Sequence, residues 1–119
     1  MPSRSDGYLL DMLLACRSIR DFTSGQTQRS FSCDRLRIRA VEREIEILGE
    51  AARNLDEKTR QRFPSLDFRA IVGMRNIVSH DYRQVRVDVL WETSQEHVPK
   101  VIAVLGPYLE KLGRESREQ

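Results

Sequence analysis

Residues 40–55 read Ala40-Val-Glu-Arg-Glu-Ile-Glu-Ile-Leu-Gly-Glu-Ala-Ala-Arg-Asn-Leu55 and have the clearest helical periodicity in this chain of 119 residues. Apolar side chains in and just before this stretch recur at steps of three and four, which places them on one face of an α-helix. They are Ile38, Val41, Ile45, Leu48, Ala52 and Leu55. The pattern predicts a helix from about Cys33 to Leu55 whose apolar stripe packs against neighbouring helices of a bundle.

The opposite face of this helix is charged. Its residues can form ion pairs three or four positions apart: Arg35, Arg39, Glu42, Arg43, Glu46, Glu50 and Arg53. Each such pair contributes only ~0.2–0.5 kcal/mol, so the pairs serve solubility more than stability. Gly49 lies in mid-helix, where it costs ~1 kcal/mol relative to alanine. We therefore expect a close backbone approach at Gly49, and we expect Ser32 or Asp34 to cap the start of the helix.

Helical spacing also marks the segments on both sides of this helix. Residues 7–23 predict an amphipathic helix, which a polar break at 24–30 follows. Residues 57–62 predict a short helix that Asp56 caps and Pro64 ends.

Two further helices complete the predicted fold. Asp67 should start the first, whose buried side carries Phe68, Ile71 and Val72. The second covers about 87–112, and we expect its prolines, Pro99 and Pro107, to kink or divide it. No segment alternates as a strand would. The predicted fold class is therefore all-α, an antiparallel bundle of four to five helices.

Size and charge limit the possible functions. The length predicts a single domain, 1–119, with loose ends at 1–6 and 113–119. The net charge of only +2 gives no broad basic field of the kind that holds duplex nucleic acid. Any contact with a nucleic acid must then be local, and the basic candidates are Arg69, Arg75, Arg83 and Arg86. A solvated face of mixed charge would explain the flanking arginines equally well.

Cys16 and Cys33 are the only cysteines and form no C-x-x-C pattern. Unpaired thiols fit a reducing cytosol, although a disulfide between the two stays open. With two histidines and no Cys/His clustering, neither a structural metal site nor a cofactor is expected. No segment resembles a signal peptide or reaches the length of a membrane span, so we expect a cytoplasmic protein without a membrane partner.

The residues with chemical potential gather in Gly73-Met-Arg-Asn-Ile-Val-Ser-His-Asp-Tyr82. On a helix Asn76 and His80 would lie one above the other, and Arg75 would lie on the adjacent strip. A long guanidinium at the edge of the His80 strip could reach a phosphate that the imidazole also touches. From this spacing alone, a cap and salt-bridge cluster is the commoner explanation.

RNA cleavage without a metal ion needs a base for the ribose 2′-hydroxyl, a cation for the phosphorane and an acid for the leaving 5′-oxygen. His80 suits either proton transfer, because an imidazole titrates near neutral pH. Arg75 suits the cationic role, because its planar fork stays charged and grips a phosphate bidentately. Asn76 could orient the imidazole or bind a phosphate oxygen.

The spacing Arg75-x4-His80-x-Tyr82, with Asn76 directly after the arginine, resembles the signature of the HEPN superfamily and, within it, of the HepT toxins of HepT/MntA toxin–antitoxin pairs. The resemblance covers nearly the whole chain, roughly 8–112. Its other matching segments are Leu9–Met12, Ala40–Leu55, Phe63-Pro64 and Ile71–Asn76.

This resemblance implies an endoribonuclease that works without a metal ion as a homodimer. It implies that Arg75 and His80 are catalytic, with Asn76 as the accompanying polar residue. The chemistry agrees on one point, because one motif histidine per chain cannot easily act as both base and acid in a single turnover. A symmetric dimer would bring two such histidines into one cleft.

The resemblance also implies regulation at Tyr82, as the acceptor of AMP from an MNT-type nucleotidyltransferase antitoxin in a type VII toxin–antitoxin pair. A bulky anion beside Arg75 would occupy the position of the RNA phosphate and neutralise the cation. Without the resemblance, Tyr82 would be assigned to packing at the helix end. His97 stands where the family usually has aspartate, and we expect it at the surface or in an interface.

An alternative of another class is a non-catalytic HEPN subunit that serves a nucleotidyltransferase as partner or substrate-binding subunit. A plain helical dimerisation domain is a third reading. Four polar functional residues on one stretch favour the toxin, since a scaffold does not need all of them together.

Overall fold

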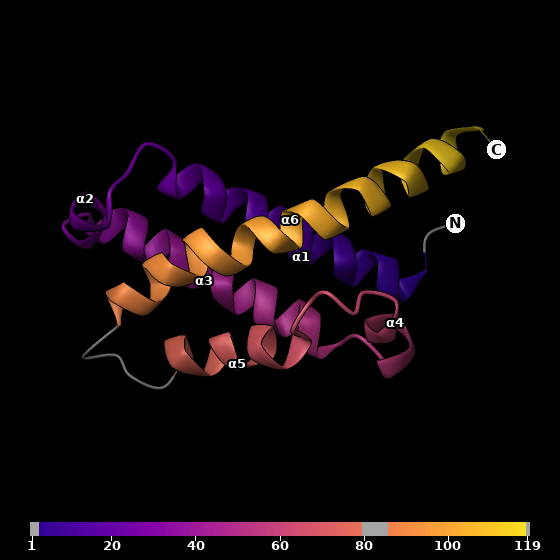
Figure 1. Ribbon diagram of the computed structural model, residues 1–119, viewed down its shortest axis with the longest axis horizontal. Helices are drawn as coiled ribbons and strands as arrows, with labels where there is room; N and C mark the ends of the chain where they lie inside the picture. The colour runs from indigo at the N-terminus through magenta and orange to yellow at the C-terminus, as the bar shows by residue number, and fades with distance from the viewer. Residues whose placement is uncertain (1–2, 80–85, 119) are drawn as a thin grey trace.

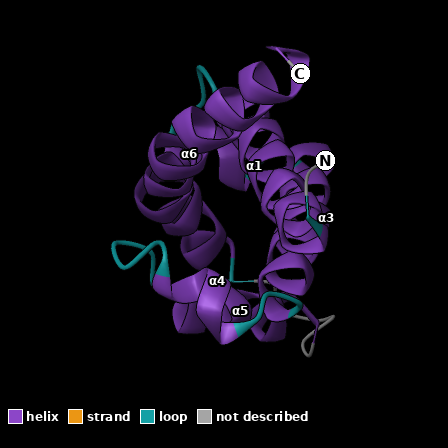
Figure 2. Cartoon of the chain, turned by 90° about the vertical axis from the view of Figure 1, so that its right-hand side faces the viewer, coloured by secondary structure: helices purple, strands orange, loops and turns teal. Residues whose placement is uncertain are grey.

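The computed structural model describes residues 3–79 and 86–118, with the backbone alone for residues 77–79. All regular structure in these residues is helical, as Figures 1 and 2 show. The helices are α1 (Arg4–Thr23), α2 (Gln28–Ser32), α3 (Arg35–Arg53), α4 (Glu57–Gln61), α5 (Phe68–Ser79) and α6 (Val87–Glu118). Successive long helices cross the molecule in opposite directions (Figure 1). The predicted all-α bundle is confirmed.

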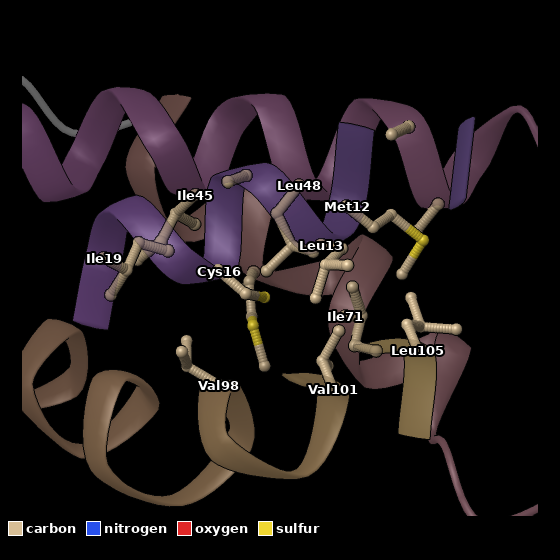
Figure 3. Packing of buried hydrophobic residues seen from close by; sticks show 14 of the residues in the cluster. Met12, Leu13, Cys16, Ile19, Ile45, Leu48, Ile71, Val98, Val101 and Leu105 are labelled. Atoms are coloured by element: carbon tan, nitrogen blue, oxygen red, sulfur yellow. The ribbon is translucent and has the colours of Figure 1, made fainter. Parts of the chain in front are cut away.

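Helix α3 is the centre of the bundle. It packs against α1 and α5 and also contacts α2 and α6, while α1 packs on α6 as well. The apolar stripe predicted for α3 is confirmed, since all its members are buried except the half-buried Ile38. Figure 3 shows side chains from α1, α3, α5 and α6 meeting in this core. Burying one such Leu, Ile or Val side chain contributes about 1.5–3 kcal/mol, so the core supplies most of the driving force for folding.

Aspartate side chains determine where three of the helices begin. Each accepts a hydrogen bond from the backbone N–H three residues further on, at 3.1 Å for Asp34, 2.8 Å for Asp56 and 3.0 Å for Asp67. Such a cap satisfies one of the otherwise unpaired donors of the first helical turn. Asp34, rather than Ser32, is therefore the cap of α3, and the caps predicted for α4 and α5 are confirmed.

The N-terminal region is more helical than the sequence predicted. Helix α1 begins at Arg4, within the segment 1–6 that we expected to be loose, because Ser3 and Asp6 form a capping box with two hydrogen bonds of 3.1 Å. Helix α2 overlaps the expected polar break at 24–30 and brings Phe31 into the core, where its side chain is fully buried. A single large apolar residue thus anchors a short helix in a polar segment.

Helix α6 is longer and less interrupted than expected. It continues through Pro99 and Pro107 without dividing, and it extends past residue 113 to Glu118. Each proline removes one backbone hydrogen bond. Packing against α1 holds the helix together around them, through the fully buried side chains of Val98, Val101 and Leu105.

Helices α3 and α5 approach each other closely at Gly49. A β-carbon added to Gly49 would lie 2.7 Å from Cβ of Arg75 and 3.5 Å from the carbonyl oxygen of Ile71. Both atoms are fixed by the backbone of α5, so neither can rotate away. The predicted close approach is confirmed, and it determines how near α5 lies to the centre of the bundle.

A hydrogen-bonded cluster joins the start of α1 to α6 and to the end of α4. The hydroxyl of Tyr108 donates to Oδ1 of Asp6 at 2.8 Å and accepts from Nη2 of Arg62 at 2.7 Å. Burial alone would raise the pKa of Asp6. The hydrogen bonds from Tyr108 and Ser3, with the charge of Arg62, outweigh burial and lower the pKa below its usual 3.8. The cluster therefore stabilises the ionised carboxylate.

Neither cysteine forms a disulfide: Cys16 is buried and Cys33 is exposed. Burial, together with the charge of Glu44, raises the pKa of Cys16 to about 12, so this thiol behaves as a core side chain. Within residues 3–79 and 86–118, no helix is both long enough and apolar enough to cross a membrane.

Replacing Gly49 by alanine is expected to destabilise the protein. Overpacking costs about 1–3 kcal/mol, which exceeds the gain of ~1 kcal/mol in helix propensity. Gly73→Ala is the matched control, because no described atom lies within 4 Å of a β-carbon added there. This variant should gain about 0.5–1 kcal/mol. Urea denaturation monitored by circular dichroism measures the free energy of unfolding of each variant. Equal stabilisation by the two substitutions would contradict the close approach of α3 and α5 at Gly49.

Tyr108→Phe is expected to lower the free energy of unfolding by about 1–3 kcal/mol at pH 7, because it removes a hydrogen bond to a buried carboxylate. The pKa of Asp6 is lower in the folded protein than in the unfolded chain. Its stabilisation is therefore fully present above pH 3.8 and is lost as the pH falls through the folded pKa. The difference between wild type and Tyr108→Phe should shrink in denaturation curves recorded below pH 3.8. A difference that does not depend on pH would show that the hydroxyl does not act on Asp6.

Candidate functional site

Helix α5 positions the described half of the motif. It lies at one edge of the bundle, against α3, in both Figure 1 and Figure 2. Its buried side carries Phe68, Ile71 and Met74. A helix with one buried side must turn the intervening positions toward solvent, and these include the first two residues of the motif.

The structure describes two of the four predicted site residues. Arg75 is half-buried at the side of α5, and Asn76, the next residue, is exposed. His80 and Tyr82 lie outside the described residues. The structure therefore places the candidate phosphate-binding cation and its polar neighbour, and it leaves the proton-transfer residue and the modification site as predictions.

Arg75 is held by a carboxylate from the neighbouring helix. Its Nη1 lies 2.8 Å from Oε2 of Glu50 on α3, a short distance typical of a charge-assisted hydrogen bond. The side chains of Arg75 and Glu50 are 38% and 44% exposed, so the pair lies at the protein surface where a ligand can reach it. Gly49, directly before Glu50, packs against the start of the same arginine side chain.

Glu50 is shared between two guanidinium groups. Its other oxygen, Oε1, lies 3.2 Å from Nη2 of Arg53, three residues further along α3. The hydrogen bond from Arg53, followed by the charges of Arg53 and Arg75, outweighs the opposing effect of desolvation and lowers the pKa of Glu50. One carboxylate between two arginines leaves the cluster with one net positive charge, which suits an anionic ligand.

A hollow of about 330 Å³ lies between α1 and α3, next to this cluster. Its wall includes Tyr8 and Asp11 from α1 and Glu46, Glu50 and Asn54 from α3. Glu50 thus connects the hollow to Arg75. A second hollow, of about 430 Å³, is lined by residues of the segments 20–26 and 94–103 and contains none of the predicted site residues.

Among the residues that the structure describes, Glu50 pairs with neither Arg69 nor Arg86 of the predicted basic set. Arg69 is exposed near the start of α5. Arg86 pairs with Asp88 at 3.4 Å, and Arg83 lies outside the described residues. The mixed-charge surface that we considered for the flanking arginines accounts for Arg69 and Arg86.

Phe68 and Trp91 serve packing, and the second histidine lies away from the motif on α6. Phe68 is buried, and the ring centroids of Trp91 and Phe31 lie 5.5 Å apart. His97 is half-buried on α6. Among residues 3–79 and 86–118, no three His, Cys, Asp or Glu side chains are grouped as a metal site would require.

Glu50 is the residue of the candidate site that the sequence did not predict. We expected it to pair along α3, and the contact with Arg53 is of that kind. Its contact with Arg75 joins positions 25 apart in sequence, which no helical periodicity can predict. Gly49 was the available signal, because a predicted close approach in mid-helix implies that its neighbour lies beside another helix.

Comparison with known proteins identifies the family. Residues 12–107 match the family model described as "Ribonuclease HepT-like". A protein of Methanocaldococcus jannaschii named "Putative RNase MJ1380" is 33% identical over 94 residues, which cover 79% of this chain and 86% of that protein. The "Probable ribonuclease HepT" of Thermococcus cleftensis is 35% identical over 94 residues, with the same coverage of 79% and 86%.

No solved structure gives a significant match to the chain. The match to the family model nevertheless spans most of the sequence, from α1 to α6, and its residues 12–107 include positions 75–82. This chain therefore belongs to the HepT-like ribonuclease family.

Proposed function

We propose that this protein is an endoribonuclease that cleaves RNA without a metal ion, as the toxin of a HEPN/MNT toxin–antitoxin pair. The observation that carries the proposal is the guanidinium of Arg75, which Glu50 holds at the protein surface. The chain's membership of the HepT-like family supports the same assignment. The cluster around it has one net positive charge, as a site for an RNA phosphate requires.

The proposed reaction is a transesterification within RNA. His80 takes the proton of the ribose 2′-hydroxyl, whose oxygen attacks the adjacent phosphorus. Arg75 stabilises the negative charge of the phosphorane, with Asn76 as a further hydrogen-bond donor. The bond to the 5′-oxygen then breaks, and this oxygen takes up a proton from an acid. The products are a cyclic 2′,3′-phosphate and a 5′-hydroxyl end.

We further propose that the active form is a homodimer. The reaction needs a base and an acid in one turnover, and the motif supplies one histidine per chain. Two-fold symmetry would place a second His80 and a second Arg75 in the same cleft, so that one imidazole acts as base and the other as acid.

A binding subunit without catalytic activity is the second candidate function. It is favoured by the ion pair itself, because a guanidinium that already has a carboxylate partner could serve partner recognition. Such a subunit would bind a nucleotidyltransferase or its substrate. Cleavage assays separate the two functions.

His80→Ala is expected to lower RNA cleavage by at least ~100-fold, because general acid–base catalysis contributes on that scale. The assay uses a mixed RNA substrate, a strong chelator and protein whose intact mass shows no attached AMP. His97→Ala is the matched control, since His97 is the only other histidine and lies on α6. Its cleavage rate should equal that of wild type.

The products and the oligomeric state complete this test. Cleavage should leave 5′-hydroxyl ends, and light scattering should show a dimer at assay concentrations. Absence of cleavage by unmodified, dimeric wild type would favour the binding subunit. Activity of a monomer would exclude the shared cleft.

Tyr82→Phe is expected to retain cleavage and to resist silencing. In wild type the phenolic oxygen would attack the α-phosphorus of ATP, pyrophosphate would leave, and the phenol proton would pass to solvent. The partner nucleotidyltransferase and Mg-ATP should therefore add one AMP to wild type and to the control variant Tyr8→Phe, but none to Tyr82→Phe. Intact mass spectrometry measures the adduct, and an adduct on Tyr82→Phe would refute this role.

A further inference from the structure

The contact between Arg75 and Glu50 differs from the other ion pairs of the described residues. Those pairs join residues one to three positions apart, such as Arg53 with Glu50 and Arg43 with Glu46. Arg75 and Glu50 belong to two different helices. Within residues 3–79 and 86–118, it is the one ion pair that fixes a side chain of α5 relative to α3.

Global stability does not explain this contact well. Ion pairs as exposed as this one typically contribute ~0–1 kcal/mol, because solvent screens the charges and two long side chains lose freedom. The adjacent Gly49 already brings the two helices together through backbone packing. A charge on α3 is therefore not needed to dock α5.

The contact does determine the direction of the Arg75 side chain. The backbone of α5 places Cβ of Arg75 beside Gly49, and Glu50 holds the guanidinium at Nη1. An arginine has several rotatable bonds, and fixing both ends removes most of their freedom before a ligand arrives. Pre-organisation of this kind is what a site for a developing phosphorane charge requires.

A carboxylate beside a phosphate site would normally weaken binding of the phosphate. Here Arg53 binds the second oxygen of Glu50 at 3.2 Å, so two guanidinium groups share one negative charge. The positive charge of Arg75 is therefore not cancelled. Glu50 can orient the arginine while the cluster remains attractive to an anion.

We propose that Glu50 is a positioning residue of the ribonuclease site, which acts through Arg75 by holding its guanidinium in the orientation that meets the scissile phosphate. Glu50 does not contact the RNA. This inference rests on the proposed function, because it assigns Arg75 to the phosphate.

The test compares Glu50→Ala and Glu50→Gln in single-turnover cleavage and in steady-state kinetics. Glu46→Ala is the matched control, because it removes the same negative charge from α3. Glu46 lies one turn before Glu50 and pairs with Arg43 at 3.2 Å. We expect Glu50→Ala to lower kcat by roughly 10-fold or more without raising KM, because misorientation affects the transition state. Glu50→Gln should keep more activity than Glu50→Ala, because its amide oxygen still accepts from Arg75.

A double-mutant cycle with Arg75→Ala shows whether Glu50 acts through the arginine. If it does, Glu50→Ala should have no further effect on cleavage once Arg75 is absent. Three results would overturn the inference: kcat of Glu50→Ala within twofold of wild type, a raised kcat, or the same loss in the presence and absence of Arg75. A purely structural role would lower the unfolding midpoint of Glu50→Ala instead.

NMR separates failure of this inference from failure of the proposed function. Equal cleavage by wild type and Arg75→Ala would refute the assignment of Arg75 to the phosphate. The line shape of the Arg75 Nε–H signal, assigned by its loss in Arg75→Ala, still reports on the guanidinium. The holding role of Glu50 is supported if rotation of the Arg75 guanidinium is restricted in wild type and in Glu46→Ala but free in Glu50→Ala. Free rotation of the guanidinium in wild type, Glu46→Ala and Glu50→Ala alike overturns the inference about Glu50.

Discussion

The packing of α3 on α5 at Gly49 is the constraint on which the candidate site depends. A β-carbon at position 49 would clash with the Cβ atom of Arg75, so only glycine fits there. The two helices can therefore approach until the backbone of α3 lies beside the backbone of α5. Hydrophobic burial of Ile71 and Met74 drives α5 against the bundle, but burial has no direction along the helix axis. The missing β-carbon supplies the register. It brings Arg75 level with Gly49 and therefore within reach of the next residue, Glu50.

The same arrangement explains how a helical bundle keeps a charged group available at its surface. Helix α3 packs its apolar stripe into the core and carries ion pairs such as Arg43–Glu46 on the opposite face. Glu42, which we expected on that face, is buried and pairs with Arg39. Glu50 lies at the boundary, where α3 meets α5 and borders the hollow of about 330 Å³. A carboxylate at that boundary can bind a partner along its own helix and a partner on the neighbouring helix at once, and Glu50 binds both.

The remaining polar contacts between helices are structural. Tyr108 links Asp6 to Arg62 at the end of the molecule where α1 begins. Arg37 donates to the carbonyl oxygen of Phe22 at 2.9 Å, near the end of α1, and Arg60 donates to that of Ala52 at 3.0 Å. These contacts satisfy carbonyl groups and a buried carboxylate, and they hold the ends of the helices in place. The contact at Arg75 differs because it is an ion pair between two helices, Arg75 on α5 and Glu50 on α3.

The sequence by itself determined the helical class, the stripe of α3, the aspartate caps of α4 and α5 and the significance of Gly49, because each follows from local spacing or from one residue's own chemistry. It also carried the family resemblance that the comparisons confirm. Tertiary structure alone decided the formation of α2 around Phe31 and the continuity of α6 through its prolines, since packing against other helices offsets weak local propensity. It alone revealed the partner of Arg75. An ion pair between residues 25 positions apart depends on the register of two helices, and only the packed core sets that register.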